Sequence, residues 1–480
     1  MNIKAIFHSI GRLLWVESVL MFIPLIVSFI YKESTYWSFI IPIFALSVVG
    51  LLLFLIKPSN KSIHAKEGFA IVGLSWVLLS LFGCLPFVIS RQIPSFIDAF
   101  FETVSGFTTT GASILTNVES LSKSMLFWRS FTHWIGGMGV LVFVLAILPS
   151  SDGNNIFILR AESTGPKVGK LVSKVKVTAR ILYLIYIVMT IIQIAFLVCG
   201  EMDLFESIVH SFATAGTGGF SIKSTGLQEY SIYSQMIITV FMFLFGVNFN
   251  IFYLIIIGKI TQAIISEELW WYISFIVIST ILITINVFPL YDNLQLTLKD
   301  ALFQVTSIIT STGFATTDFN LWPNLSKAVL FFLMFVGACA GSTGGGIKVS
   351  RIVILFKSIR REIRKLVHPN SVTNIKFEQT TVEESVVKGV ANYFVIIMVL
   401  FAIGVLIVSF DSFGNFETNM SAVATCLNNI GPGFGLVGPM GNFSEYNVIS
   451  KLTLIFLMLI GRLEIYPILI IFNPKVWLNK

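Results

Sequence analysis

Charged side chains are scarce in this sequence. Lys, Arg, Asp and Glu make up 12% of its 480 residues, whereas soluble domains usually carry about 25%. No polar stretch is long enough to bury a core of its own, which argues against a string of soluble domains. Hydrophobic residues reach 55%, so we predict an all-α polytopic membrane protein that forms one integral bundle.

Cysteine and histidine are also few. The four cysteines are scattered through apolar stretches, and no Cys-x-x-Cys or Cys/His spacing predicts a metal site or a disulfide framework. Catalytic His, Asp or Cys residues do not cluster near one membrane face, as a membrane enzyme would require. We therefore expect no enzymatic activity and no covalent cofactor.

Ten hydrophobic runs are long enough to span a bilayer. They cover residues 13–31, 37–56, 67–90, 125–149, 179–200, 232–258, 270–290, 326–356, 385–410 and 446–472. The first is too long for the apolar part of a signal peptide and is interpreted as a retained span. Most lysines and arginines fall on the side that holds the N-terminus, which places both termini in the cytoplasm. The net charge of +7 thus reflects topology and does not indicate a nucleic-acid surface.

A short pattern occurs four times among these runs. Each copy begins with Asp or Thr and reaches a glycine 13 residues later: Asp98–Gly111, Asp203–Gly216, Asp300–Gly313 and Thr418–Gly431. Asp and Thr can cap a helix start, and about ten helical residues extend roughly 15 Å, half of a ~30 Å hydrocarbon core. Each copy is predicted to be a half-helix that enters the membrane from outside. Irregular backbone at that depth is viable only beside a water-filled path.

The tips of the four copies carry no charge. Backbone carbonyls supplied from four sides can replace the hydration shell of a cation, and the C-terminal end of each half-helix adds a partly negative dipole. A monovalent cation that sheds water readily is favoured, potassium ahead of sodium. The predicted potassium-binding filter residues are Thr109, Thr110, Gly111, Thr214, Ala215, Gly216, Ser311, Thr312, Gly313, Asn429, Ile430 and Gly431.

A glycine-rich segment, Val336 to Lys348, interrupts the eighth run. Its glycines cannot hold a regular helix, because each costs about 1 kcal/mol relative to alanine. The segment is either a place of close helix packing through small residues or, as we prefer, an unwound hinge that blocks or opens the path. It is not a phosphate loop, because Gly346 is followed by Ile347 and not by Lys.

Arg462 lies midway along the last run, where an ionisable residue is costly and commonly functional. If it faces the path, it would repel cations and donate hydrogen bonds to carbonyls of the glycine-rich segment. Alternatively Glu464 or another buried group neutralises it, and the two interpretations are compatible. The predicted gate residues are Gly337, Gly341, Gly344, Gly345, Gly346, Lys348 and Arg462.

Other polar residues of the spans are interpreted as structural. Arg129 lies between Trp128 and Trp134 and is predicted to anchor the chain at the outer interface. Glu102 and Glu206 are interpreted as charges at helix starts.

The runs and half-helices together predict two leading spans followed by four span–half-helix–span units. The predicted segments are the leading spans (1–62), the first unit (63–150), a cytoplasmic connection (151–178), the second unit (179–262), the third unit with its glycine-broken second helix (263–366), another cytoplasmic connection (367–384) and the fourth unit (385–480). Each connection is either a solvated loop or a docking face for a cytoplasmic partner.

Four motifs carry a resemblance to a known family. They are Thr-Val-Ser-Gly-Phe-Thr-Thr-Thr-Gly-Ala, Ala-Gly-Ser-Thr-Gly-Gly-Gly-Ile-Lys, Leu-Asn-Asn-Ile-Gly-Pro-Gly and Gly-Arg-Leu-Glu. Together they resemble the membrane subunit of the Trk/Ktr potassium-uptake family over nearly the whole chain, and the two leading spans are similar to the Trk branch.

The resemblance implies a multi-pass protein of the bacterial inner membrane. It further implies a homodimer with one pore per subunit, gated by a cytoplasmic ring of nucleotide-binding, RCK-type (TrkA-like) subunits. In that family the loop glycines line the filter, and the segment Gly337–Lys348 and Arg462 form the gate. Related plant-type transporters with serine at the position of Gly111 tend towards sodium.

The leading hypothesis is potassium uptake through a gated, channel-like pore with a four-loop carbonyl filter. An ion-coupled secondary carrier, a sodium or proton symporter, is the first alternative, although such carriers usually keep carboxylates in the path and the loop tips have none. A less selective sodium/potassium transporter is the second. A polytopic enzyme is the least favoured.

Overall fold

The computed structural model describes residues 1–58, 64–139, 175–371, 373–471 and 474. The described part is almost entirely helical, which confirms the predicted fold class, and its one sheet is the hairpin of β1 (Lys376–Phe377) and β2 (Thr380–Thr381). The helices up to the middle of the chain are α1 (Ile3–Leu20), α2 (Phe22–Ile30), α3 (Tyr36–Leu55), α4 (Ala65–Gly83), α5 (Leu85–Ile89), α6 (Phe96–Phe107), α7 (Lys123–Gly137), α10 (Val175–Cys199), α11 (Leu204–Gly216), α12 (Ile232–Gly246) and α13 (Phe249–Ile256). The remaining helices are α14 (Ile260–Ile264), α15 (Glu267–Tyr291), α16 (Leu294–Ile309), η2 (Phe319–Leu321), α17 (Asn324–Val336), α18 (Val349–Val367), α19 (Glu384–Val408), α20 (Phe416–Asn428), η3 (Gly435–Val437), α21 (Val448–Arg462) and α22 (Tyr466–Ile471).

Six helical segments of the described residues are long and apolar enough to cross a membrane. They are Ile3–Ile30, Tyr36–Leu55, Lys66–Ile89, Ala179–Cys199, Glu267–Tyr291 and Glu384–Val408. The pair α12 and α13 would make a seventh, but it is bent by 91°. The predicted run 125–149 continues beyond residue 139 and lies partly outside the described residues.

Within the described residues, three of the ten predicted runs are interrupted by two or more non-helical residues. Run 232–258 is the bent pair, run 326–356 is broken between α17 and α18, and run 446–472 is broken between α21 and α22. In the last of these, Glu464 and Ile465 adopt φ angles of 57° and 70°, a left-handed conformation that ends a right-handed helix. Average hydrophobicity does not register such a local break.

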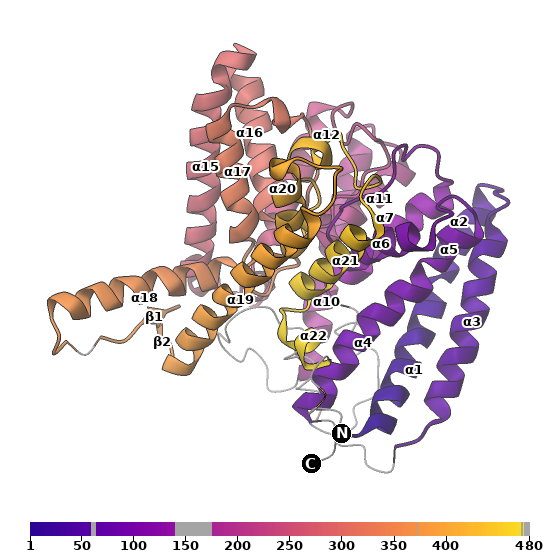
Figure 1. The fold of residues 1–480 in the computed structure, drawn as a ribbon. Helices are drawn as coiled ribbons and strands as arrows, with labels where there is room; N and C mark the ends of the chain where they lie inside the picture. Colours follow the sequence, from indigo (N-terminus) through magenta and orange to yellow (C-terminus); the bar gives the residue numbers. More distant parts are fainter. Residues whose placement is uncertain (59–63, 140–174, 372, 472–473, 475–480) are drawn as a thin grey trace.

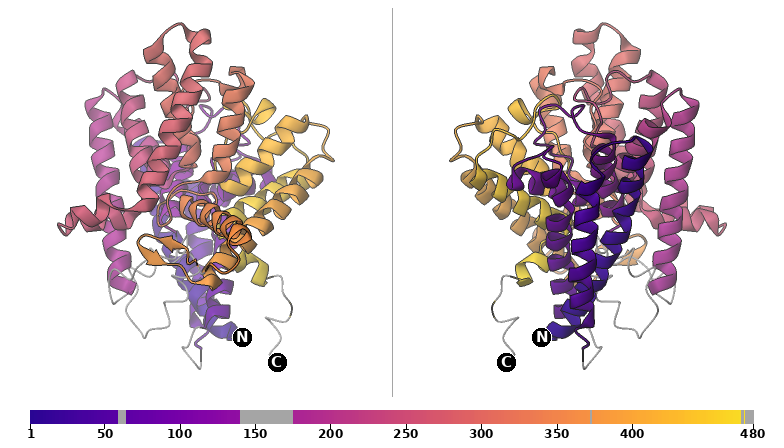
Figure 2. Two further views of the ribbon diagram at one scale, coloured as in Figure 1. Left: turned by 90° about the vertical axis from the view of Figure 1, so that its left-hand side faces the viewer. Right: turned by 90° about the vertical axis from the view of Figure 1, so that its right-hand side faces the viewer.

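Helices α1 and α3 pack side by side at one edge of the molecule (Figures 1 and 2). Gly11 of α1 faces Gly50 of α3, and a Cβ atom on Gly11 would lie 2.7 Å from the carbonyl oxygen of Gly50. Small residues at the contact allow the two backbones this close approach. The outer face of α3 exposes large apolar side chains such as Phe44, as a surface that meets lipid would.

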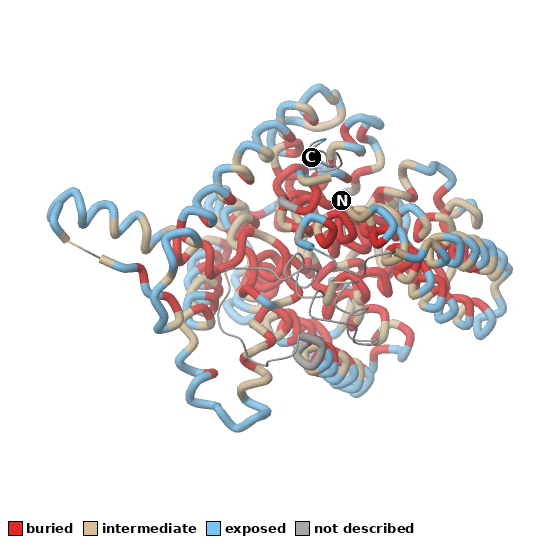
Figure 3. The backbone as a smooth tube through the Cα atoms, turned by 90° about the horizontal axis from the view of Figure 1, so that it is seen from below, coloured by how far each residue is buried: buried red, intermediate tan, exposed pale blue. Residues whose placement is uncertain are grey.

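The four short helices α6, α11, α16 and α20, here called the central helices, are buried in the middle of the bundle. Helix α7 packs against α6 and α11, α12 against α11 and α16, α17 against α16 and α20, and α21 against α20 and α6. These contacts form a closed circle. In the view from below, buried backbone is concentrated at the centre and exposed backbone lies around it (Figure 3).

Candidate ion path

Polar side chains begin the four central helices. Four side chains accept hydrogen bonds from first-turn amides: Ser95 before α6, Asp203 before α11, Asn293 before α16 and Asn415 before α20. The expectation that Asp98, Asp300 and Thr418 are caps is wrong, because each of them lies inside its helix. Only the expected cap at Asp203 is present.

The chain leaves each central helix with the same backbone conformation. A residue with φ between 54° and 57° is followed, two positions later, by a glycine with φ between 73° and 103°. These pairs are Thr109 and Gly111, Thr217 and Gly219, Ser311 and Gly313, and Asn429 and Gly431. The amide of the residue between them donates to the carbonyl five positions earlier, at 2.9 Å in all four loops. This hydrogen bond is typical of a helix that ends in a left-handed residue.

The register of the second loop differs from the one that equal spacing suggested. Gly219, and not Gly216, takes the conformation that Gly111 has in the first loop. Gly216 is the last residue of α11, and a Cβ atom on it would lie 2.2 Å from the carbonyl oxygen of His133. The interval from the observed capping residue to the glycine with positive φ is 16 residues for α6, α11 and α20 (95 to 111, 203 to 219, 415 to 431). In α16 the interval is 20 residues (293 to 313), about one helical turn more.

The four loops contact one another in cyclic order. A Cβ atom on Gly111 would lie 2.0 Å from the carbonyl oxygen of Gly218 in the second loop. The equivalent distances are 2.0 Å from Gly219 to Thr312, 2.0 Å from Gly313 to Ile430 and 2.8 Å from Gly431 to Thr110. The carbonyls that precede the four glycines therefore belong to one closed ring of backbone, which we call the loop ring, and no side chain fits at its glycines.

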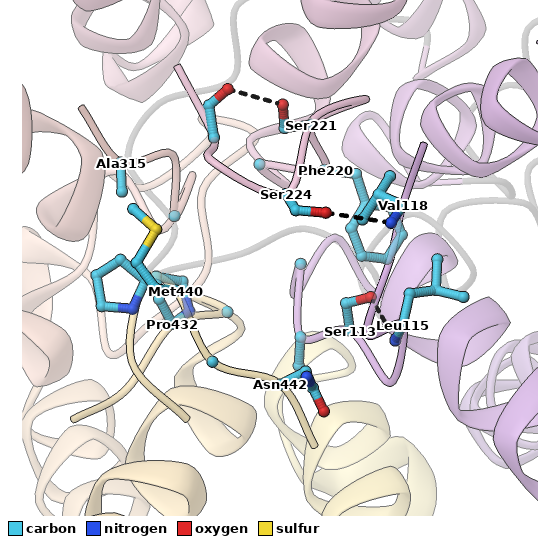
Figure 4. A pocket seen from close by; sticks show the side chains of 18 of the residues that line it. Ser113, Leu115, Val118, Phe220, Ser221, Ser224, Ala315, Pro432, Met440 and Asn442 are labelled. Carbon is cyan, nitrogen blue, oxygen red and sulfur yellow. Dashed lines mark hydrogen bonds between the residues drawn. The ribbon is translucent and has the colours of Figure 1, made fainter. Parts of the chain in front are cut away.

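A cavity of about 110 Å³ opens beside the loop ring (Figure 4). All four ring glycines line it, together with residues that follow them in each loop, such as Phe220 and Pro432. A water molecule needs roughly 10–15 Å³ of such space, so the cavity can hold several waters. At its rim the Ser224 amide and hydroxyl donate to Glu119, at 2.7 and 2.6 Å. Partial burial would raise the pKa of Glu119, but these hydrogen bonds prevail and keep it below its usual value.

The glycine-rich segment lies against the third and fourth loops. The Gly345 amide donates to the Ser311 hydroxyl at 2.5 Å. A Cβ atom on Gly344 would lie 2.8 Å from the Thr310 carbonyl oxygen, and one on Gly345 would lie 2.6 Å from that of Asn428. Residues 337–348 form no regular helix, and three of their glycines have φ between 71° and 75°. The segment thus fits closely against the third and fourth loops because Gly344 and Gly345 have no side chains.

Arg462 joins the glycine-rich segment to the end of α7. Its Nη1 donates to the carbonyl of Thr343 at 2.9 Å, and its Nη2 donates to carbonyls of the last turn of α7, that of Gly137 at 2.8 Å. The expected hydrogen bond between Arg462 and this segment is therefore present. Glu464 accepts a hydrogen bond from Arg351 at 2.6 Å. Lys348 donates through its ammonium to a carbonyl within the segment itself.

Comparisons with known proteins show the family of this chain. The family described as "TrkH: Cation transport protein" matches residues 38–478. The chain belongs to the TrkH family. It is 36% identical to the Trk system potassium uptake protein TrkH of Escherichia coli K12 over 99% of this chain and 100% of that protein. It is 32% identical to the Trk system potassium uptake protein TrkG of the same organism, over 99% of each. The crystal structure of the potassium transporter TrkH from Vibrio parahaemolyticus matches with a TM-score of 0.89 and 32% identity, over 100% of both chains.

In this TrkH-family chain, sequence reasoning missed a buried ion pair. Arg129 was predicted at the outer interface and Glu102 as a helix-start charge, but Arg129 is 4% exposed and Glu102 is 1% exposed. Arg129 Nε donates to Glu102 at 2.6 Å. Only the tertiary structure reveals this pair, because the hydrophobic residues that surround Glu102 and Arg129 in the sequence do not indicate which charged side chains face each other.

A second missed residue is Glu268, at the start of α15. Its buried carboxylate accepts hydrogen bonds from the amides of Ala340 at 2.7 Å and Ser350 at 3.2 Å. It therefore holds residues on both sides of the three consecutive glycines. Within the described residues no group of three or more His, Cys, Asp or Glu side chains could hold a metal ion.

Proposed function

We propose that this chain takes up potassium through a gated, channel-like path whose filter is the loop ring. The observation that carries the proposal is the cyclic contact of four uncharged loops, each with a backbone carbonyl placed directly before its glycine. Carbonyls in such a ring can replace the water that a cation loses. The relatives at 36% and 32% identity are named Trk system potassium uptake proteins, which supports potassium as the ion.

The proposed filter residues differ from the sequence prediction in one loop. In the first, third and fourth loops they remain residues 109–111, 311–313 and 429–431. In the second loop we replace residues 214–216 by Thr217, Gly218 and Gly219, because these share the backbone angles and the 2.9 Å helix-ending hydrogen bond of the other three.

The proposed gate is the glycine-rich segment together with Arg462. The segment occupies the side of the loop ring next to Thr310 and Asn428, and Arg462 places a positive charge beside it. A cation that leaves the filter would meet both. Assembly as a homodimer in the bacterial inner membrane, with an RCK-type cytoplasmic partner, is proposed on the family relationship, as is the division of the chain into two leading spans and four units.

Crystals of the protein soaked in rubidium would test the filter. Anomalous scattering is expected to place rubidium within the ring, nearest to the carbonyls of Thr110, Gly218, Thr312 and Ile430. Rubidium bound beside residues 214–216 would instead support the filter residues that the sequence predicted for the second loop. Uptake of rubidium into liposomes that contain the purified protein would test the transport function itself, and liposomes without protein provide the background.

A further inference from the structure

The buried ion pair of Glu102 and Arg129 touches two of the four loops. The Glu102 carboxylate accepts from the Ser113 hydroxyl at 3.0 Å and from the Ile114 amide at 2.9 Å, both in the first loop. Arg129 Nη1 donates to the carbonyl of Ser221 in the second loop at 2.8 Å. Ser113 and Ser221 each lie two residues beyond the ring glycine of their loop, so the pair connects the two loops at equivalent positions.

The surroundings of the pair make this connection stiff. The guanidinium of Arg129 lies over the ring of Phe220, with 3.5 Å between its Cζ and the ring centroid. Phe220 follows Gly219 directly, and its ring centroid is 4.1 Å from that of His133. Hydrogen bonds and charge contacts gain strength where water is excluded, and a buried charge that loses its partner is strongly unfavourable.

Among the four central helices, only α6 has a charged residue nine positions before its ring glycine. The residue nine positions before the ring glycine is Glu102 in α6, His210 in α11, Gln304 in α16 and Ala422 in α20. The buried side-chain amide of Gln304 has no hydrogen-bond partner among the described residues. The ring is therefore held asymmetrically, and its first and second loops are joined by charge.

Arg129 also lines the cavity beside the ring. Ser113, Phe220 and Ser221 line the same cavity (Figure 4). An unpaired positive charge there would repel an approaching cation, and the carboxylate of Glu102 neutralises it at 2.6 Å.

We propose that Glu102 and Arg129 determine ion selectivity, by fixing the distance between the first and second loops and by keeping the mouth of the path electrically neutral. Both are positioning residues, since they act through the loops. The inference rests on the proposed potassium-uptake function.

Uptake of rubidium and of sodium into liposomes would be compared for three variants. Glu102→Gln removes the charge and is expected to lower both rubidium uptake and the rubidium-to-sodium ratio, the ratio by about tenfold, which corresponds to about 1.4 kcal/mol. The double variant Glu102→Gln with Arg129→Met is neutral, so uptake should recover while the ratio stays low. Arg129→Lys keeps the charge but loses the planar fork that reaches both partners, so the ratio should fall while uptake is largely kept.

Glu417→Gln is the matched control. Glu417 also lies on a central helix and forms an ion pair, with Lys327 at 3.6 Å, but its side chain is 48% exposed. It should leave the ratio unchanged. Provided that wild-type uptake continues, two results would overturn the inference. One is an unchanged rubidium-to-sodium ratio in both Glu102→Gln and Arg129→Lys, and the other is an equal fall of this ratio in the control. If Glu102→Gln does not fold, Arg129→Lys decides. Absence of rubidium uptake by the wild type would instead overturn the proposed function.

Discussion

A single added carbon atom would not fit at the ring glycines. At Gly111 the backbone is left-handed, with φ of 80°, and a Cβ atom would lie 2.0 Å from the Gly218 carbonyl oxygen. Real Cβ atoms do not come so close, so the first and second loops would have to separate.

Gly111→Ser is therefore expected to lower the rubidium-to-sodium uptake ratio by about tenfold, a loss of about 1.4 kcal/mol in discrimination. The measurement is paired uptake in liposomes. Gly389→Ala in α19 is the control, because a Cβ atom there meets nothing within 4 Å, and it should transport like the wild type. A ratio unaffected by Gly111→Ser would remove the first loop from the filter.

Arg462 can also be tested by a single substitution. Arg462→Ala removes a positive charge and the hydrogen bond to Thr343. If the arginine helps to close the path, rubidium uptake by the purified protein should rise severalfold in the absence of any partner. Uptake that stays constant or falls, with the variant still folded by size-exclusion chromatography, would exclude Arg462 from the gate.

Residue identities that depend on local backbone were predictable, and those that depend on tertiary contacts were not. Thr-Thr-Gly and Ser-Thr-Gly at helix ends indicated the first and third loops directly. In the second loop, Ala-Gly-Thr-Gly-Gly offers several glycines within four residues, and spacing from Asp203 selected Gly216 because the other three caps had been placed wrongly. The ion pair of Glu102 and Arg129 left no pattern in the sequence.

At the scale of elements, the glycine-rich segment depends on groups outside itself. Glu268 accepts from amides on both sides of its consecutive glycines, those of Ala340 and Ser350. In turn Glu378, in the turn between β1 and β2, accepts from the Ser266 hydroxyl and the Glu268 amide, at 2.8 and 3.0 Å. The segment is thus linked to the hairpin through the start of α15.

Glu268→Gln should loosen the segment, because a neutral amide is a weaker acceptor for two amides than a carboxylate. We expect faster hydrogen exchange across residues 337–350 and a severalfold rise in rubidium uptake. The neighbouring Glu267→Gln is the control, since Glu267 is partly exposed and pairs with Lys357 instead. If exchange and uptake match those of the control, Glu268 does not restrain the segment.

The elements themselves were predicted with mixed success. Uninterrupted spans such as α3, α15 and α19 follow from length and hydrophobicity alone. The bend between α12 and α13 arises where Val247 leaves the helix and the Asn248 side chain caps the next one. The break after α21 needs two left-handed residues, Glu464 and Ile465, which neither composition nor propensity would suggest.

For the whole molecule, the proposed channel-like path predicts how far potassium can accumulate. A potential of 100 mV, negative inside, favours entry of one positive charge by about 2.3 kcal/mol, which supports an accumulation ratio of about 50-fold at equilibrium. Liposomes with an imposed potential and radioactive rubidium would give the ratio.

A symporter that carries one proton with each potassium ion moves two charges, and at the same potential it could approach about 2,500-fold. A ratio well above 50 would therefore favour the coupled carrier and contradict a simple path. Collapse of the potential with an ionophore should abolish accumulation in either case and serves as the control.

Closure of the circle of loops within one polypeptide frees each quarter to differ from the others. In a tetramer of identical subunits, every mutation appears four times around the axis, and a useful change at one corner is inseparable from the same change at the rest. Here the residues before the ring glycines are Thr110, Gly218, Thr312 and Ile430, three different amino acids at four corresponding corners. Evolution, or an engineer, can therefore adjust the affinity for an ion one corner at a time.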